Sequence, residues 1–289
     1  MVNLFRISGM GGGRVNVTNN LRLMCVLAHP DDESLGVGGT LARYASEGVE
    51  THIVMGTRGE KGRYGEGIEF PGFAAVGKIR EAELHAAARE LGVHEVHFLD
   101  YIDGSLAQVD HAEAIAKIST HLRRVRPQIV ITFGPEGAYG HPDHIAICQL
   151  TTAALICAAD PSYVPSSDTA TAFPPHRVSK LYYIAWPQGK WTAYQAAFRD
   201  LKIQVDGEER RVVPWPDWAV TTIIDTNAHW AAVWRAVCCH QTQLSIYSKL
   251  EHLPKEHHEL VWGTQEFYRV FSLVNGGRKR ETDLFEGLI

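Results

Sequence analysis

The chain has 289 residues, of which 45% are apolar and 21% are charged, and its formal net charge is −5. This composition is typical of a folded globular protein and not of a disordered one, and the length suits one large domain with a substantial core. The acidic balance gives no electrostatic support for a nucleic-acid or anionic-membrane partner. A small neutral or polar substrate fits this balance better. No apolar run approaches the roughly 20 residues that a membrane span needs.

The N-terminal segment, residues 1–20, contains a glycine-rich stretch but neither the apolar run nor the cleavage-site pattern of a secretory signal. We expect a flexible leader there and a cytoplasmic protein. The chain also carries an odd set of cysteines without CxxC spacing: Cys25, Cys148, Cys157, Cys238 and Cys239. They predict neither a disulfide framework nor a cysteine-based zinc site, and we interpret them as small core residues.

From Leu21 onward, strand and helix patterns alternate regularly. The run LRLMCVLA predicts a buried parallel strand that stops at His29, and THIVMGT, HEVHFL and IVITF predict the next three strands. Apolar residues at helical spacing predict helices over 34–47, 78–91, 112–126 and 142–159. The glycine- and charge-rich segment 58–77 is predicted to be a long loop, and such loops in compact domains are often functional.

This alternation predicts a Rossmann-like α/β fold, with a mostly parallel sheet and helices on both of its faces. We expect one domain over residues 21–289, with its core in 21–160 and a smaller C-terminal appended region in 161–289. Prolines break the pattern after Asp160. Beyond them the pattern predicts strands at 180–186 and 220–225, a helix at 228–239 and an edge strand at 267–274, and leaves 191–217 undecided.

The first cluster of chemically informative residues is AHPDDES, residues 28–34, at the end of the first predicted strand. In open α/β sheets, ligands bind at this carboxyl edge. His29, Asp31 and Asp32 offer imidazole nitrogen and carboxylate oxygen, which are both good ligands for a divalent metal such as zinc. The alternative is that the two aspartates only cap the following helix.

The second cluster is YGHPDH, residues 139–144, at the end of the fourth predicted strand. Pro142 suits the first position of a helix, and His141 and His144 are spaced to face the same side of that helix start; alone, they could be two solvated caps. Strands 1 and 4 of such sheets commonly flank the ligand-binding crevice, so we expect the two clusters to meet. Three protein ligands and one open position describe a catalytic zinc site.

AHPDDES followed by a distal GHPDH resembles the LmbE-like (PIG-L) superfamily of zinc-dependent N-acetylglucosaminyl deacetylases, over about residues 21–155. The resemblance implies that one zinc ion per chain is held by His29, Asp32 and His144. It further implies that Asp31 is the general base, and that His141 stabilises the developing oxyanion or assists the leaving group.

Other matching positions imply supporting roles. Tyr139 matches a tyrosine beside the scissile carbonyl, and Asp143 would orient a neighbouring imidazole. The segments GTRGE, DYIDGSL and CHQTQ resemble substrate-binding elements and point to Arg58, Asp103, His240 and Gln243. Alternatives stay open for all four: a surface salt bridge for the arginine, an Asp-Gly turn for the aspartate, and core or cap positions for the last two. Trp186, Trp191 and Tyr194 could line a sugar site, although aromatic side chains are more often core.

The resemblance therefore implies a zinc-dependent hydrolase that removes the N-acetyl group from an N-acetylglucosamine-type substrate, a small glycoside or glycoconjugate. An amidase acting on a thiol or sugar conjugate would use the same metal residues. A metal-dependent phosphoesterase would hold two metal ions and need more carboxylates than we can assign. A third alternative is a non-catalytic carbohydrate- or cofactor-binding protein, which would keep the pocket but carry out no reaction. The partner we expect is a sugar substrate, and a homo-oligomer is compatible with the sequence.

Overall fold

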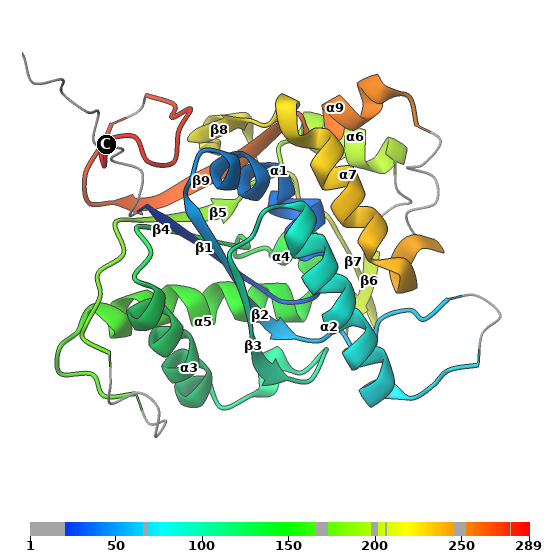
Figure 1. The fold of residues 1–289 in the computed structure, drawn as a ribbon, viewed down its shortest axis with the longest axis horizontal. Coiled ribbons are helices and arrows are strands. Elements are labelled where there is room, and N and C mark those ends of the chain that lie inside the picture. Colours follow the sequence, from blue (N-terminus) through cyan, green and yellow to red (C-terminus); the bar gives the residue numbers. More distant parts are fainter. Residues whose placement is uncertain are drawn as a thin grey trace, which may run out of the picture.

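The protein is built around a seven-stranded sheet with the order β3-β2-β1-β4-β5-β9-β8 (Figure 1). This computed structural model describes residues 21–65, 69–165, 173–197, 202–205, 207–245, 253–277 and 279–289. The strands of the sheet are β1 (Arg22–Leu27), β2 (Glu50–Thr57), β3 (Glu95–Tyr101), β4 (Ile129–Thr132), β5 (Lys180–Ile184), β8 (Thr222–Asp225) and β9 (Thr264–Ser272). The first five are parallel, whereas β9 runs antiparallel to β5 and β8. The expected mostly parallel sheet is confirmed.

Helices cover both faces of the sheet, as predicted (Figure 1). On one face α3 packs against α5, and on the other α7 packs against α1 and α2. The helices are α1 (Asp32–Ser46), α2 (Phe73–Glu90), α3 (His111–Val125), α4 (Gly137–Gly140), α5 (Pro142–Ala159), α6 (Gln188–Ala197), α7 (Trp230–Cys239) and α9 (Lys255–Trp262). Short 3₁₀ turns are η2 (Leu106–Gln108), η4 (Asp217–Ala219), η5 (Asn227–His229) and η6 (Gln241–Gln243).

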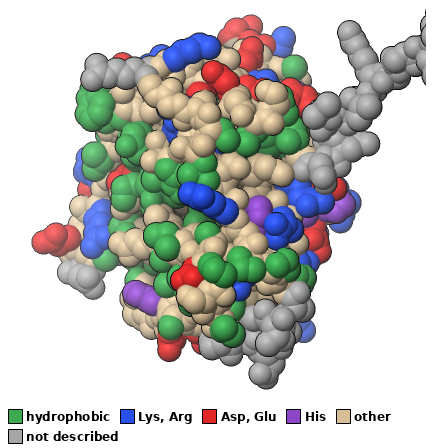
Figure 2. Space-filling model, turned by 90° about the vertical axis from the view of Figure 1, so that its left-hand side faces the viewer, with side chains coloured by type: hydrophobic (Ala, Val, Ile, Leu, Met, Phe, Trp, Pro, Cys, Tyr) green, Lys and Arg blue, Asp and Glu red, His purple; other side chains and the backbone are tan. Residues whose placement is uncertain are grey.

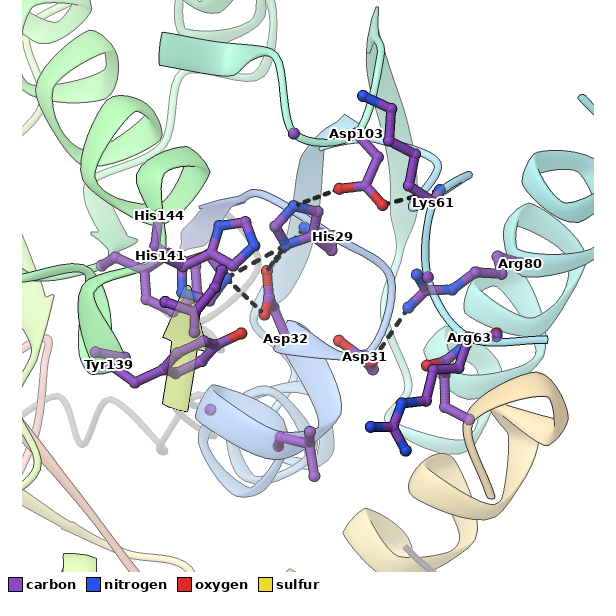
Figure 3. Close-up of a pocket in the computed structure, with 18 of the residues that line it drawn as sticks. His29, Asp31, Asp32, Lys61, Arg63, Arg80, Asp103, Tyr139, His141 and His144 are labelled. Atoms are coloured by element: carbon purple, nitrogen blue, oxygen red, sulfur yellow. Dashed lines mark hydrogen bonds and ion pairs between the residues drawn. The ribbon is translucent and has the colours of Figure 1, made fainter. Parts of the chain in front are cut away.

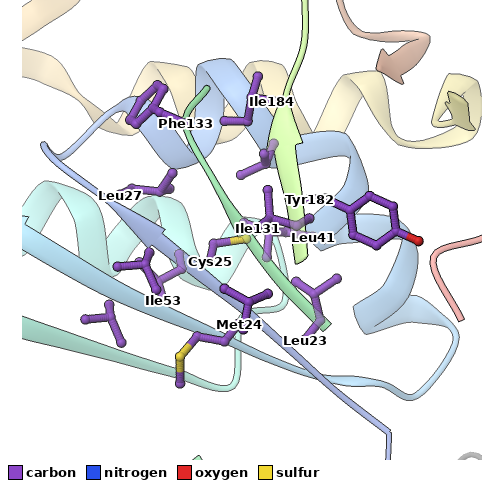
Figure 4. Packing of buried hydrophobic residues seen from close by; sticks show 14 of the residues in the cluster. Leu23, Met24, Cys25, Leu27, Leu41, Ile53, Ile131, Phe133, Tyr182 and Ile184 are labelled. Carbon is purple, nitrogen blue, oxygen red and sulfur yellow. The ribbon is translucent and has the colours of Figure 1, made fainter. Parts of the chain in front are cut away.

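The core lies along the central strands, where both faces of the sheet are covered. Met24 of β1 and Ile131 of β4 are completely buried, and Leu41 of α1 and Tyr182 of β5 pack into the same cluster (Figure 4). Burying one large apolar side chain contributes about 1.5–3 kcal/mol. Because both faces of these strands are buried, their sequences are continuous apolar runs. All five cysteines are free, and Cys25 belongs to this core.

Helix α5 is the most apolar helix near the site. By length and composition alone it could cross a membrane, but 56% of its residues are buried inside the protein. Its contacts with α3, β1 and β4 are those of a core helix of a globular domain. This packing holds the start of α5 against the carboxyl ends of the strands.

The C-terminal half departs from the predictions in several places. β9 is not an edge strand: it lies between β5 and β8, and β8 forms the edge. The undecided stretch 191–217 contributes to α6 and contains a hairpin of β6 (Lys202–Val205) and β7 (Glu208–Arg211). Helix α9 was not predicted, and α2 begins at Phe73, so the loop before it is shorter than expected. For β9 the cause is its long-range pairing with β5 and β8, which a local pattern does not record. The predicted leader, residues 1–20, lies outside the described residues.

Candidate metal and active site

The two sequence clusters meet at the carboxyl ends of β1 and β4, which are neighbouring parallel strands. β1 leads through His29 into α1, and β4 leads through the kinked turn α4 into α5. Asp32 is the first residue of α1, and His144 lies in the first turn of α5. The structure therefore brings together His29, Asp32 and His144, although 115 residues separate the two histidines (Figure 3).

The separations between these three side chains suit a single divalent ion. His29 Nδ1 lies 3.3 Å from His144 Nε2, the Asp32 carboxylate lies 3.4 Å from His144 Nε2, and it lies 3.7 Å from His29 Nδ1. Zinc bonds of 2.0–2.2 Å at tetrahedral angles place neighbouring ligand atoms about 3.3–3.5 Å apart. Each of the three side chains is at most 10% exposed. The donor set and its spacing fit the predicted metal.

The other nitrogen of His29 points to two further carboxylates. Nε2 lies 3.1 Å from Asp103 and 3.2 Å from Asp143. The buried Asp143 carboxylate also accepts the backbone N–H groups of Gly104, at 2.7 Å, and Leu106, at 3.0 Å. Asp143 is thus held rigidly and orients the imidazole of His29, a residue far away in the sequence. With its proton on Nε2, His29 presents the Nδ1 lone pair to a metal.

These carboxylates make the environment of His29 favourable for a positive charge. Burial lowers the pKa of His29, but hydrogen bonds to Asp103 and Asp143 and the charge of Asp32 outweigh it and raise the pKa to about 10. Burial raises the pKa of Asp103, but His29 outweighs this effect and brings it to about 2. A metal ion bound to His29 takes the place of an imidazole proton. The carboxylates that favour positive charge at His29 therefore also favour a bound cation.

His141 lies beside the same cluster, and its ring nitrogen is within 4.8 Å of those of His29 and His144. It caps α5, and its Nδ1 accepts the backbone N–H of Asp143 at 3.2 Å. Burial and the charge of His29 lower the pKa of His141 to about 4. His141 is therefore neutral at pH 7, with its proton on Nε2, where it can act as a donor. His29, His141 and His144 form an alternative ligand set, in competition with the set that contains Asp32.

Asp31 adopts a backbone conformation that is rare for any residue with a side chain, with φ at 109°. Two buried side chains support it: Arg80 donates to the Asp31 carboxylate at 3.1 Å and to the carbonyl of Pro30, and Glu33 accepts the Asp31 N–H at 3.0 Å. Such strain costs of order 1–3 kcal/mol, and it persists where surrounding contacts determine the conformation. The result is a carboxylate presented to the cavity next to Asp32.

A cavity of about 620 Å³ opens in front of this cluster, a size suited to a small glycoside. Most of the predicted site residues line it: His29, Asp31, Asp32, Asp103, Tyr139, His141, His144 and Gln243. Trp186 and Tyr194 also line the cavity, whereas Trp191 stacks behind them in the core. Burial raises the pKa of Tyr139, whose ring meets those of His141 and His144 edge-on.

Two residues predicted to bind substrate lie outside this cavity. Arg58 pairs with Glu81 at 2.5 Å and with Asp100 at 2.6 Å, as in the salt-bridge alternative. His240 is completely buried, and its Nε2 lies 2.7 Å from the equally buried carboxylate of Glu33. Because neither side chain reaches the cavity, both assignments are corrected: Arg58 stabilises the sheet edge, and His240 supports the residue that holds Asp31.

Three cationic side chains that the sequence did not predict for the site also line the cavity: Arg80, Lys61 and Arg63. Arg80 had a recognisable signal, since it lies on the buried face of α2 together with Val76 and Leu84. A charged residue on the apolar stripe of a helix needs a buried partner. Lys61 and Arg63 had no such signal, because they belong to a loop whose position depends on tertiary contacts.

Comparisons with known proteins place these features in a family. The family model described as GlcNAc-PI de-N-acetylase (PIG-L) matches residues 24–155. A relative from Kineococcus radiotolerans, named 1D-myo-inositol 2-acetamido-2-deoxy-alpha-D-glucopyranoside deacetylase, is 33% identical over 92% of this chain and 83% of its own length.

Solved structures show the same fold. A conserved protein from Thermus thermophilus is 27% identical, with a TM-score of 0.63 over 89% of this chain and 97% of its own. The 4-carboxy-2-hydroxymuconate hydratase from Pseudomonas putida is 22% identical, with a TM-score of 0.61 over 89% of this chain and 99% of its own, so the fold alone does not define the reaction. The sequence relationship does define the family: the chain belongs to the PIG-L (LmbE-like) family.

Proposed function

We propose that the protein is a zinc-dependent hydrolase that removes the N-acetyl group from an N-acetylglucosamine-type glycoside. The observation that carries this proposal is the meeting of His29, Asp32 and His144, with ligand atoms 3.3–3.7 Å apart, in a cavity that Asp31 also lines. The relative at 33% identity is named for the deacetylation of such a glycoside, which supports the same reaction here.

His29, Asp32 and His144 would hold one zinc ion per chain. Imidazole and carboxylate ligands suit zinc, and three protein ligands leave a position open to water and substrate. A bound zinc ion supplies Lewis-acid chemistry, which makes an amide carbonyl more electrophilic and a water molecule more acidic.

Asp31 is the proposed general base. Its carboxylate takes a proton from the attacking water and then delivers it to the nitrogen of the departing amine, a role for one well-placed carboxylate. Arg80 holds that carboxylate through a 3.1 Å contact to Oδ2. The guanidinium is buried and fixed by the carbonyls of Pro30 and Gly59, so that Asp31 is positioned before substrate arrives.

His141 and Tyr139 are the proposed donors to the carbonyl oxygen as it gains negative charge. The Nε2–H of neutral His141 and the hydroxyl of Tyr139 both belong to side chains that line the cavity. Donors that are already oriented cost no reorganisation when the charge develops. Asp103 and Gln243, which line the same cavity, are the proposed contacts to sugar hydroxyls.

A sugar- or thiol-conjugate amidase remains the second candidate, because it would use the same metal residues. The phosphoesterase alternative is less well supported: the further carboxylates, Asp103 and Asp143, contact His29 and also accept backbone N–H groups. Together with His29 they form a second group whose ligand atoms lie within 4.8 Å of one another, but this group shares His29 with the proposed zinc site, so the two groups do not give two independent metal sites. A cytoplasmic location and a homo-oligomer stay predictions from the sequence.

The test is acetate release by the purified protein from N-acetylglucosaminides, including the inositol glycoside for which the relative is named. We expect release that stops with a chelator and returns with zinc. Metal analysis should give one zinc per chain, whereas two would favour a phosphoesterase. Failure to release acetate from any N-acetylglucosaminide with zinc bound would refute the proposal.

A further inference from the structure

Two side chains that follow α7, those of His240 and Thr242, are buried but do not line the cavity. His240 Nε2 lies 2.7 Å from Oε1 of Glu33, in the first turn of α1. The backbone N–H and the hydroxyl of Thr242 both donate to the carboxylate of Glu83 on α2, each at 2.7 Å. The segment after α7 therefore ties the first turn of α1 to the buried face of α2.

Both of these helices also hold Asp31. The other oxygen of Glu33, Oε2, accepts the backbone N–H of Asp31 at 3.0 Å. Arg80, one turn before Glu83 on α2, donates to the Asp31 carboxylate at 3.1 Å (Figure 3). The backbone of Asp31 is thus fixed from α1 and its carboxylate from α2, and the segment after α7 holds the two supports together.

These contacts bury ionisable side chains. On the face shown in Figure 2, Asp, Glu, Lys and Arg side chains lie at the surface, where water solvates them. Glu33 and His240 are instead completely buried, and Glu83 is 8% exposed. Burying such groups costs free energy that their mutual contacts only offset, and an apolar pair in the same place is often at least as stable. The stability of the fold therefore does not explain the pair of Glu33 and His240.

The conformation of Asp31 gives the pair a role. Its φ of 109° lies in the region that residues with a side chain rarely adopt, and its side chain does not cap α1. A strained conformation persists only where the surrounding contacts determine it. The Asp31 N–H is the backbone group that Glu33 accepts, so without this acceptor the backbone could relax towards an ordinary φ. The carboxylate would then turn away from its place beside Asp32.

We propose that Glu33 and His240 are positioning residues for the general base: the buried pair fixes the backbone of Asp31, so that its carboxylate stays where it transfers the proton. This inference rests on the proposed deacetylase function and adds two residues that do not touch the substrate. A base that is misplaced by about 1 Å can cost 10²-fold in rate. Substrate binding should not change, because neither residue lines the cavity.

The test replaces both partners together, because removing one alone would leave the other buried without its partner. In Glu33→Leu/His240→Leu, two apolar side chains fill the space and the Asp31 N–H has no side-chain acceptor at position 33. In Glu33→Gln/His240→Gln, the amide oxygen at position 33 still accepts this N–H, and its NH₂ group donates to the amide oxygen at position 240. The two variants therefore differ in the acceptor that they offer to Asp31.

Kinetics of acetate release from methyl N-acetyl-α-glucosaminide give the first measurement. We expect kcat to fall about 10–100-fold in Glu33→Leu/His240→Leu, with KM and zinc content as in the wild type. Glu33→Gln/His240→Gln should restore kcat towards the wild-type value. The control is Glu281→Gln, which removes a buried charge beside the first residue of β5. It lowers stability away from the site and should leave kcat unchanged.

Hydrogen exchange at the Asp31 amide gives a second measurement, which needs neither zinc nor substrate. In the chelator-treated protein, followed by NMR, this amide should exchange about tenfold faster in Glu33→Leu/His240→Leu than in the wild type. In Glu33→Gln/His240→Gln it should stay slow. The single variant Glu33→Leu leaves His240 Nε2 3.4 Å from the Ser34 hydroxyl, and it gives the same comparison if the double variant does not fold.

Wild-type kcat in Glu33→Leu/His240→Leu, or an equal loss of kcat in both double variants, would overturn this inference and leave the deacetylase proposal standing. Unchanged exchange at the Asp31 amide would overturn it as well. If the wild type released acetate from no N-acetylglucosaminide, the deacetylase proposal itself would be refuted, and the exchange measurement would still decide whether the pair holds the Asp31 backbone.

Discussion

Replacing Glu281 by glutamine should lower the free energy of unfolding at neutral pH. In acid the same substitution should lower it by less. The Glu281 side chain is only 1% exposed. Its carboxylate is contacted at 2.7–2.9 Å by Lys180, Tyr182, Thr222, Arg269 and Asn275. These contacts join the C-terminal segment to β5, β8 and β9, the part of the sheet that local sequence patterns described least well.

The size of the effect follows from the pKa of Glu281. Burial raises this pKa, but the donors, led by Lys180 and Asn275, outweigh burial and lower it from the usual 4.5 to about 2. A shift of this size contributes about 3 kcal/mol to the free energy of unfolding. Because the folded-state pKa is the lower one, the contribution is complete above about pH 5 and is lost as the pH falls towards 2. At pH 3 about 2 kcal/mol of it has gone.

Urea unfolding of the wild type and of Glu281→Gln, at pH 7 and at pH 3, measures this directly. The difference in unfolding free energy between the two proteins should be about 2 kcal/mol smaller at pH 3 than at pH 7, since other carboxylates titrate equally in both. Glu259→Gln, on the surface of α9, is the control and should show no such change. A difference that is the same at both pH values would refute the reasoning.

Three further predictions concern the site. Asp31→Asn should keep its metal and lose about 10²–10⁴-fold in turnover, measured as acetate release beside metal content; an unchanged rate would remove the proposed base. His144→Ala should lose the metal whereas His141→Gln keeps it, as counted by elemental analysis after dialysis, and equal losses would favour the ligand set with His141 in place of Asp32. Asp143→Asn should weaken metal affinity about 10–100-fold, because it disturbs the contact to His29; equal affinity in a chelator competition would contradict this.

The N-terminal half could be predicted from the sequence because each element there carries its own signal. The strands β1, β2 and β4 are buried on both sides, so they appear as continuous apolar runs between helices of clear spacing. In the C-terminal half, the elements do not each carry such a local signal. β9 is stabilised by antiparallel pairing with β5 and β8, and no local pattern says which strands will be its neighbours.

The site shows the same division. His29, Asp32 and His144 could be identified because two compact motifs follow two strands whose carboxyl ends must share an edge. Arg58 and His240 were wrongly predicted to bind substrate. An arginine or a histidine is as well suited to a salt bridge or a buried pair as to a contact with a sugar. Which of these occurs depends on where Glu81, Asp100 and Glu33 lie.

The amino-acid sequence by itself determined the fold class and the chemistry that the motifs can support, since strand and helix periods and the donor atoms of His and Asp are local properties of the chain. Only the tertiary structure decided the surroundings of that chemistry. It places Asp103 and Asp143 against His29 and pairs Arg80 with Asp31. It also brings Lys61 and Arg63 to the lining of the cavity. Those relations join residues from different elements, and the packing of the whole domain sets their distances.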